Sequence, residues 1–230
     1  MKDNSSYQET FLSSLPFDLT SAQKRVWEEI REDLVADVPM RRLLQGDVGS
    51  GKTLIGALAA LHAKSNDWQT ALLCPTEILA EQHFSSFKGW FENVGIKVCL
   101  LTGSTKSKDR KLIIEDLEKG NIDILIGTHA IFQLGVNFHK LGLTIIDEQH
   151  RFGVHQRFSM LEKGGANNQS PHQLIMTATP IPRTLAMTVY GSLETSIIDE
   201  LPPGRNPVQT SSRPDSYRDR VIKRVEEVCL

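Results

Sequence analysis

The segment from Gly46 to Thr53 constrains the fold of this chain more than any other part of its sequence. It reads Gly-Asp-Val-Gly-Ser-Gly-Lys-Thr and fits the pattern of a glycine-rich loop that holds phosphate groups. Glycines let the backbone curl so that successive N–H groups point at phosphate oxygens, and the helix that follows aims its positive end at the same place. In such a loop Lys52 can reach the β- and γ-phosphates of a nucleotide, and the Thr53 hydroxyl can ligate Mg²⁺.

The residues on either side favour this interpretation over a flexible Gly/Ser loop without a ligand. Leu43–Gln45 has the character of a strand and Thr53–Lys64 that of a helix, which is the context the motif requires. We therefore predict ATP and Mg²⁺ as cofactors. The residues expected to bind the nucleotide here are Gly46, Asp47, Val48, Gly49, Ser50, Gly51, Lys52 and Thr53.

Short apolar runs alternate with helical patterns along most of the chain. Such alternation predicts an α/β fold, with a mostly parallel sheet of about seven strands flanked by helices. The helices expected between strands include Lys52–Lys64, Glu77–Asn93 and Ser107–Lys119. The strand candidates are Arg42–Gln45, Thr70–Cys74, Lys97–Leu101, Ile122–Ile126, Leu143–Asp147, Gln173–Thr177 and Thr195–Ile198.

Composition excludes several other classes of protein. The 26 basic and 28 acidic residues give a formal charge of −2, which argues against a wholly basic coat for nucleic acid. The three cysteines Cys74, Cys99 and Cys229 are too few and too far apart for a disulfide scaffold. No apolar stretch approaches the roughly 18 residues that a membrane span needs. We expect a cytoplasmic protein without membrane contact.

The chain is expected to divide into three parts. Residues 1–12 are polar and Ser-rich and predict a flexible leader, and residues 13–204 form the main domain. The Pro-rich run 201–207 predicts the exit from that domain, so that residues 205–230 are a linker and the start of a second domain. Asp215 is expected to cap a final helix with one apolar stripe, made of Tyr217, Val221, Val225 and Val228.

A second acidic signal follows the apolar run Leu143–Ile146. Asp147 and Glu148 end this run, and the carboxyl ends of strands are where open α/β sheets bind ligands. Asp147 is expected to hold Mg²⁺ directly or through water, and Glu148 to orient and polarise the water that attacks the γ-phosphate. An acidic strand end is weak by itself, but it becomes a strong signal together with the upstream phosphate loop.

The segment Phe17–Gln23 has two interpretations that can share residues. Thr20 and Gln23 fit a capping box, in which each side chain accepts a hydrogen bond from the other's backbone. Alternatively the Gln23 amide offers a donor and an acceptor to adenine, while Phe17 packs on the adenine ring. The residues alone leave both open.

The order of these motifs resembles the first motor domain of a superfamily 2 helicase, over about residues 13 to 210. It comprises Phe17, Gln23, the loop 46–53, residues 75–82, Asp147-Glu-Gln-His150 and Thr177-Ala-Thr179. Finer segments at 126–130, 146–153, 176–187 and 198–205 resemble the bacterial branch that acts on branched DNA. Gln149 favours this branch over the transcription-repair coupling factors, which usually have Glu at that position.

The resemblance implies a RecA-like domain and a role for each matching residue. Gln23 would read adenine, and Lys52, Thr53, Asp147 and Glu148 would form the ATPase core. Gln149 and His150, counted with the catalytic residues, and Thr177, Ala178 and Thr179 would couple nucleotide state to the grip on DNA. The residues that would touch the nucleic-acid backbone are Pro75, Thr76, Thr102, Gly103, Thr128 and His129.

By the same resemblance, the whole protein would couple ATP hydrolysis to movement on double-stranded DNA and remodel forks and junctions. A second motor domain and a wedge domain would act in cis, and the protein would be a monomer. The chain itself would be weakly active or inactive in hydrolysis.

Simpler alternatives stand beside these assignments. Pro-Thr and Thr-Gly after a strand are common in turns and helix caps. The basic cluster Lys106, Lys108, Arg110 and Lys111 is usual for a solvated helix face, although it could extend a phosphate track. The chain could also be a nucleotide-binding module without a DNA role, or a structural half-motor that binds neither ligand.

Overall fold

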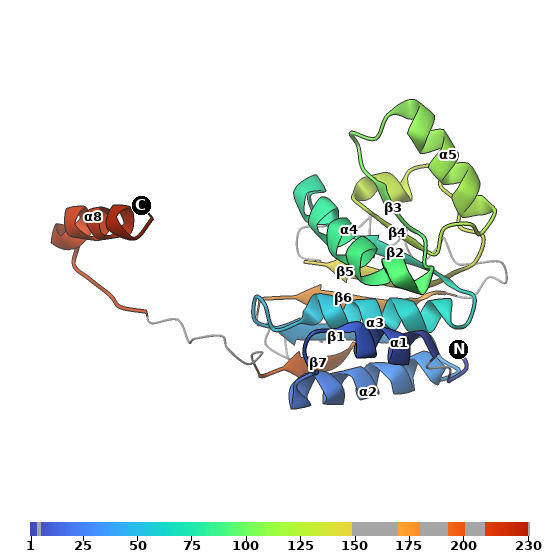
Figure 1. Cartoon of the computed structure of the whole chain (residues 1–230), viewed down its shortest axis with the longest axis horizontal. Helices are drawn as coiled ribbons and strands as arrows, with labels where there is room; N and C mark the ends of the chain where they lie inside the picture. Colours follow the sequence, from blue (N-terminus) through green and yellow to red (C-terminus); the bar gives the residue numbers. More distant parts are fainter. Residues whose placement is uncertain (4–5, 149–169, 180–192, 201–209, 230) are drawn as a thin grey trace.

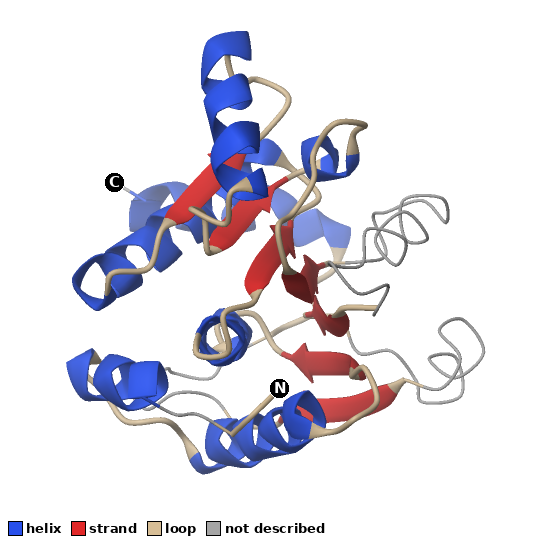
Figure 2. Ribbon diagram, turned by 90° about the vertical axis from the view of Figure 1, so that its right-hand side faces the viewer, coloured by secondary structure: helices blue, strands red, loops and turns tan. Residues whose placement is uncertain are grey.

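A computed structural model describes residues 1–3, 6–148, 170–179, 193–200 and 210–229 of the chain. Within these residues the chain forms one twisted sheet with helices packed along it (Figure 1; Figure 2). The exit segment predicted at 201–207 lies outside the described residues.

Seven parallel strands form the sheet, in the order β3-β4-β2-β5-β6-β1-β7. Each lies within two residues of a predicted run at either end, so the expected sheet is confirmed. The strands are β1 (Arg41–Gly46), β2 (Gln69–Leu73), β3 (Val98–Leu101), β4 (Ile124–Gly127), β5 (Leu141–Asp147), β6 (His172–Thr177) and β7 (Glu194–Ile198).

The predicted helices are also present. Helix α3 has the predicted bounds, α4 ends two residues early and continues into a short 3₁₀ turn, and α5 ends one residue early. The bounds are α2 (Ser21–Val35), α3 (Lys52–Lys64), α4 (Glu77–Phe91), η1 (Glu92–Val94), α5 (Ser107–Glu118) and η2 (His129–Phe132).

The sheet is buried on both faces, as expected for continuous apolar strands. Every residue of β2, β4 and β5 is buried. Alternate residues point to opposite sides: Leu44 and Ile145 join the larger core with α2, α3 and α4, whereas Leu43 and Ile146 join a smaller cluster. The carboxyl ends of the strands are therefore held by a rigid, two-sided core.

The prediction of a flexible leader over residues 1–12 has to be corrected, because most of this segment lies in a helix. Helix α1 (Ser6–Ser14) buries Phe11 completely. The Phe11 ring lies 5.5 Å from the ring of Phe91 and 6.0 Å from that of Trp90, both near the end of α4. Aromatic packing with a distant helix thus orders a segment whose polar composition suggested a leader.

The expected final helix is present, although it starts later than Asp215. A 3₁₀ turn, η4 (Asp215–Tyr217), precedes α8 (Arg218–Cys229). The predicted apolar stripe is exposed along its length, from 42% at Tyr217 to 71% at Val228. Within the described part of the chain, no helix is both long and apolar enough to cross a membrane.

Phe11→Ala should destabilise the domain by about 3–5 kcal/mol, because it removes a fully buried aromatic side chain and leaves a cavity. Urea unfolding followed by tryptophan fluorescence measures this change. Phe17→Ala is the matched control, since Phe17 is 53% exposed and its loss should cost much less. Equal unfolding midpoints for parent and Phe11→Ala would contradict the docking of α1.

Candidate functional site

Three adjacent strands deliver the predicted nucleotide site to one edge of the sheet. β6 lies between β1 and β5, and all three run in the same direction. The phosphate loop leaves β1, Thr177 ends β6, and Asp147 ends β5. Because the carboxyl ends of parallel strands share one edge, residues far apart in sequence meet there.

The phosphate loop has the backbone shape that its glycines predict. Gly49 and Gly51 have φ values of +77° and +94°, a region that side chains disfavour. Gly51 is the N-cap of α3, so the positive end of this 13-residue helix faces the loop. Within the loop, the Ser50 hydroxyl is buried without a hydrogen-bond partner. These features fit a loop shaped to receive phosphate.

Lys52 lies on the loop rather than extended away from it. Its ammonium group donates to the carbonyl oxygens of Gly46 at 2.7 Å and Asp47 at 3.0 Å. Burial lowers the pKa of Lys52, while the negative charges of Asp147, Glu148 and Asp47 act in the opposite direction. The lysine is thus a partly desolvated cation facing the predicted acidic pair.

A cavity of about 410 Å³ brings the predicted residues together. Its walls include Lys52 and Thr53 from the loop, Asp147 and Glu148 after β5, and Ala178 after β6. Helix α4 supplies a further wall that sequence reasoning missed, made of Leu79, Gln82, His83, Ser86 and Trp90. Counted from Leu79, the other four lie 3, 4, 7 and 11 residues later, which puts all five on one helix face, a pattern that could have identified this wall.

Asp147 is buried, with 9% of its surface exposed. Its Oδ2 atom lies 2.7 Å from Nε2 of His83 on α4. Cys74, which follows β2, is also buried, and burial together with the charge of Asp147 raises the pKa of its thiol. Cys74 is therefore a neutral core side chain.

Glu148 is held by the segment predicted to couple the two ligands. Its carboxylate accepts the Ala178 N–H at 2.9 Å and the Thr177 hydroxyl at 3.2 Å. The Thr177 hydroxyl also accepts the N–H of Thr179, at 3.1 Å. Glu148 has a φ of +52°, a left-handed backbone unusual for a residue other than glycine and frequent at functional sites. Gln149 and His150, the other two predicted catalytic residues, lie outside the described residues.

The oxygen donors present fit Mg²⁺. Thr53 and Asp147 line the same cavity, and a hydroxyl and a carboxylate are hard ligands that this ion accepts. The described residues contain no group of three or more His, Cys, Asp or Glu side chains placed for a metal. Mg²⁺ in nucleotide sites commonly uses one or two protein oxygens, with water and phosphates completing its shell.

The capping box predicted at Thr20 and Gln23 is confirmed. The Gln23 N–H donates to Thr20 Oγ1 at 3.2 Å, and Gln23 Oε1 accepts the Thr20 N–H at 3.0 Å. Gln23 also donates from Nε2 to the Ser50 carbonyl at 2.8 Å, so α2 braces the phosphate loop directly. With Gln23 only 3% exposed, its reading of adenine stays a prediction.

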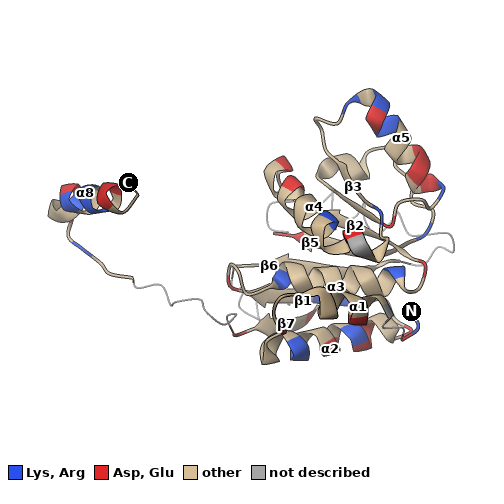
Figure 3. Ribbon diagram, in the orientation of Figure 1, with Lys and Arg blue, Asp and Glu red and all other residues tan. Residues whose placement is uncertain are grey.

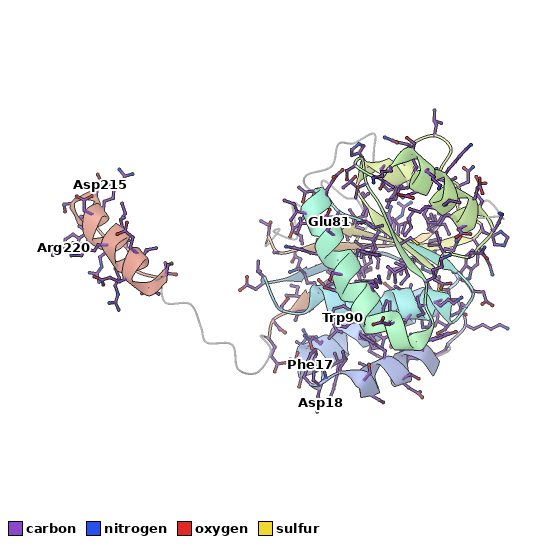
Figure 4. All side chains as sticks on the ribbon, turned by 45° about the horizontal axis from the view of Figure 1, so that its top comes forward. Phe17, Asp18, Glu81, Trp90, Asp215 and Arg220 are labelled. Carbon is purple, nitrogen blue, oxygen red and sulfur yellow. The ribbon has the colours of Figure 1, made fainter. Side chains whose placement is uncertain are left out.

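Phe17 is placed differently from Gln23. It is 53% exposed and lines a neighbouring cavity of about 290 Å³ together with Trp90. Trp90 also lines the nucleotide cavity, so the two cavities share this side chain. Figure 4 labels Phe17 and Trp90. An aromatic pair is therefore available beside the phosphate loop.

The predicted nucleic-acid residues follow the other three adjacent strands, β3, β4 and β2. Thr76 is exposed and caps α4 by accepting the Leu79 N–H at 3.3 Å, so the helix-cap interpretation holds for it. Thr102 and Thr128 are each 3% exposed, whereas Gly103 and His129 are exposed.

A carboxylate joins two of these loops. Glu77, at the start of α4, accepts the Ser104 N–H at 3.2 Å and the Ser104 hydroxyl at 2.8 Å. The turn that carries Gly103 is thereby fixed to the loop that carries Pro75 and Thr76. The structure brings these loops to one edge, and their contact with DNA stays a prediction.

The basic cluster beside this edge belongs to α5 and the residue before it. Lys106, Lys108 and Lys111 are exposed, and Arg110 donates to Gln133 at 2.9 Å. Basic residues gather in the first part of α5 and acidic residues in the last part (Figure 3). These basic residues therefore lie on a helix face exposed to solvent, which is the simpler of the two interpretations given for the cluster.

Comparison with known proteins agrees with this arrangement. The model of the DEAD/DEAH box helicase family matches residues 20–188. The chain belongs to this family.

ATP-dependent DNA helicase RecG of Escherichia coli (strain K12) is 56% identical over 227 residues, which cover 99% of this chain and 33% of that protein. RecG of Aquifex aeolicus (strain VF5) is 52% identical over 216 residues, 94% of this chain and 27% of that protein. The chain therefore spans about a third of the length of these curated relatives.

Solved structures confirm the RecA-like α/β fold. The structure of RecG bound to a three-way DNA junction matches with a TM-score of 0.86 and 46% identity, over 97% of this chain and 30% of that chain. Helicase Lhr of Mycobacterium smegmatis, bound to ssDNA and AMP-PNP, matches with a TM-score of 0.63 at 21% identity, which shows the fold alone. The similarity to RecG also confirms the finer resemblance that the motifs around Gln149 suggested.

Gly51→Ala should destabilise the domain by about 1–3 kcal/mol and weaken nucleotide binding at least tenfold, because a side chain is strained in this backbone region. The added Cβ would also lie 2.3 Å from Gln23 Nε2. Urea unfolding and calorimetric titration with Mg-ADP measure the two effects.

Gly89→Ala on α4 is the control, since a Cβ there meets no atom within 4 Å and should slightly stabilise the helix. Parent-like nucleotide affinity in Gly51→Ala would contradict the described shape of the loop.

Proposed function

We propose that this chain is the ATP-binding half of a DNA-dependent ATPase that moves on double-stranded DNA and remodels forks and junctions. The observation that carries the proposal is one cavity that holds Lys52, Thr53, Asp147 and Glu148 at the carboxyl edge of the sheet. Similarity to RecG supports the assignment to DNA, since the matching structure of that protein is bound to a three-way DNA junction.

The phosphate loop binds the triphosphate. Backbone N–H groups at the start of α3 face the phosphates, and Lys52 leaves the loop carbonyls to contact the β- and γ-phosphates. Thr53 and Asp147 hold Mg²⁺, which when bound neutralises charge on the phosphates. Phe17 packs on adenine beside Trp90, and Gln23 reads the edge of the base.

Glu148 orients the attacking water and polarises it. Its carboxylate is already fixed by Thr177 and Ala178, so little reorganisation is needed when water binds. The same two bonds link the water-orienting group to β6. We infer that Thr177, Ala178 and Thr179, with Gln149 and His150, transmit the nucleotide state to the DNA side.

DNA lies along the loops after β2, β4 and β3. The contacts come from Pro75, Thr76, Thr102, Gly103, Thr128 and His129. Hydroxyls and backbone N–H groups suit the phosphate backbone and do not read bases, so binding should be independent of sequence and sensitive to salt.

The second motor domain completes the ATP site from the opposite side, and a wedge domain selects branched DNA. The protein acts as a monomer in the bacterial cytoplasm, with these domains supplied in cis.

Lys52→Ala should lower the affinity of the chain for Mg-ADP at least 100-fold, because it removes the principal cationic side chain at the phosphates. Isothermal titration calorimetry measures the affinity. Lys88→Ala on the exposed side of α4 is the matched control and should bind like the parent. Unchanged affinity in Lys52→Ala would remove the phosphate-loop assignment.

Glu148→Gln should leave nucleotide affinity intact and lower hydrolysis by the full-length protein about 10²–10⁴-fold, because the amide keeps the shape and loses the charge that polarises water. Steady-state ATPase assays with and without forked DNA give the rates, and Glu81→Gln on α4 is the control. Parent-like turnover would mean that another residue acts as the base. An absence of DNA stimulation in the parent would favour a nucleotide-binding module without a DNA role.

A further inference from the structure

His83 makes a buried contact for which the proposed ATPase mechanism gives no reason. It lies in the second turn of α4, and its Nε2 is 2.7 Å from Oδ2 of Asp147 at the end of β5. The two side chains are 10% and 13% exposed, so solvent screens the contact little. We propose that His83 is a positioning residue that sets the orientation of the Asp147 carboxylate for Mg²⁺. This inference rests on the proposed function.

The ring of His83 is well placed to hold another group, because its own position is fixed. Ala80 and Phe87, three residues before and four residues after it, are fully buried in the larger core. The Thr76 cap fixes the start of the same helix. His83 is itself 8% exposed, so the core restricts its rotamers.

The chemistry of His83 and Asp147 determines which of them donates the hydrogen bond. An ionised carboxylate only accepts hydrogen bonds, so Nε2 of His83 carries the hydrogen and donates it to Oδ2. The bond uses one carboxylate oxygen and leaves Oδ1 for the ion or its water. Hydrogen bonds that fix a metal-binding carboxylate in this way raise metal affinity, and their loss typically costs 10–100-fold.

The hydrogen bond from His83 also stabilises the negative charge of Asp147, because this carboxylate is buried. Asp147 is 9% exposed, and a buried carboxylate without a donor is costly. Lys52 is the cation that faces Asp147 from the phosphate loop, but its ammonium group is bonded to loop carbonyls. When Lys52 turns to the phosphates, His83 still holds the Asp147 carboxylate.

The test measures metal binding rather than turnover. Electron paramagnetic resonance gives the affinity of the ADP complex for Mn²⁺, a probe that occupies Mg²⁺ sites, and calorimetry in EDTA gives ADP affinity without metal. His83→Ala and His83→Phe should each weaken Mn²⁺ binding about tenfold or more, with metal-free ADP affinity unchanged. His83→Gln should recover most of the affinity, since its amide N–H can reach the same oxygen.

Glu81→Gln is the matched control, because Glu81 lies on the exposed side of the same helix (Figure 4). Should His83→Ala fail to fold in urea titrations, His83→Phe decides, since it keeps a ring in the core and removes the ring nitrogens. Parent-like Mn²⁺ affinity in a folded His83→Ala or His83→Phe would overturn the assignment.

A double-mutant cycle separates positioning from a general effect on the fold. In an Asp147→Asn background, His83→Ala should weaken Mn²⁺ binding little further, because the carboxylate it positions is gone. Fully additive losses would overturn the proposal. If the parent chain itself does not bind Mn²⁺ with ADP, the proposed function is wrong and this assignment falls with it, an outcome distinct from a failure confined to the variants.

Discussion

Parallel pairing of the strands is the constraint on which the rest of this structure depends. All seven strands run in one direction, so each must deliver its carboxyl end to the same edge. The pairing also fixes the register, with Gln45 beside Thr177 and Asp147 beside Met176. The phosphate loop, Thr177 and the acidic pair Asp147 and Glu148 therefore lie at the ends of three adjacent strands. An antiparallel strand at β6 would place Thr177 at the opposite edge of the sheet.

The strand order further divides this edge into two regions. β1, β6 and β5 carry the nucleotide groups, while β2, β4 and β3 carry the loops proposed for DNA. Helix α4 borders both regions. Its first residue, Glu77, bonds to the Ser104 turn, and its middle turns line the nucleotide cavity. A single helix thus contacts both candidate ligand sites. A movement of α4 at one site would therefore also move it at the other.

Much of this arrangement follows from local patterns in the sequence. Continuous apolar runs located the seven strands, glycine spacing located the phosphate loop, and Thr20 with Gln23 located the start of α2. Contacts between distant segments could not be predicted in the same way. Helix α1 depends on Phe11 meeting two aromatic rings from α4, about 80 residues later in the chain. His83 and Asp147 are 64 residues apart, and nothing in either motif indicates that they touch.

The fixed register at the carboxyl edge implies where the chain can tolerate changes in length. Removing one residue within β5 or β6 would turn every later side chain of that strand to the opposite face and separate Glu148 from Ala178. At the opposite edge, the turn between α2 and β1 contributes no residue to either candidate ligand site. Between α2 and β1, Asp37, Val38 and Pro39 are exposed, so this turn is suited to accept inserted segments. Length variation among relatives should accumulate there, and a reporter fused at this turn would leave the ligand edge intact.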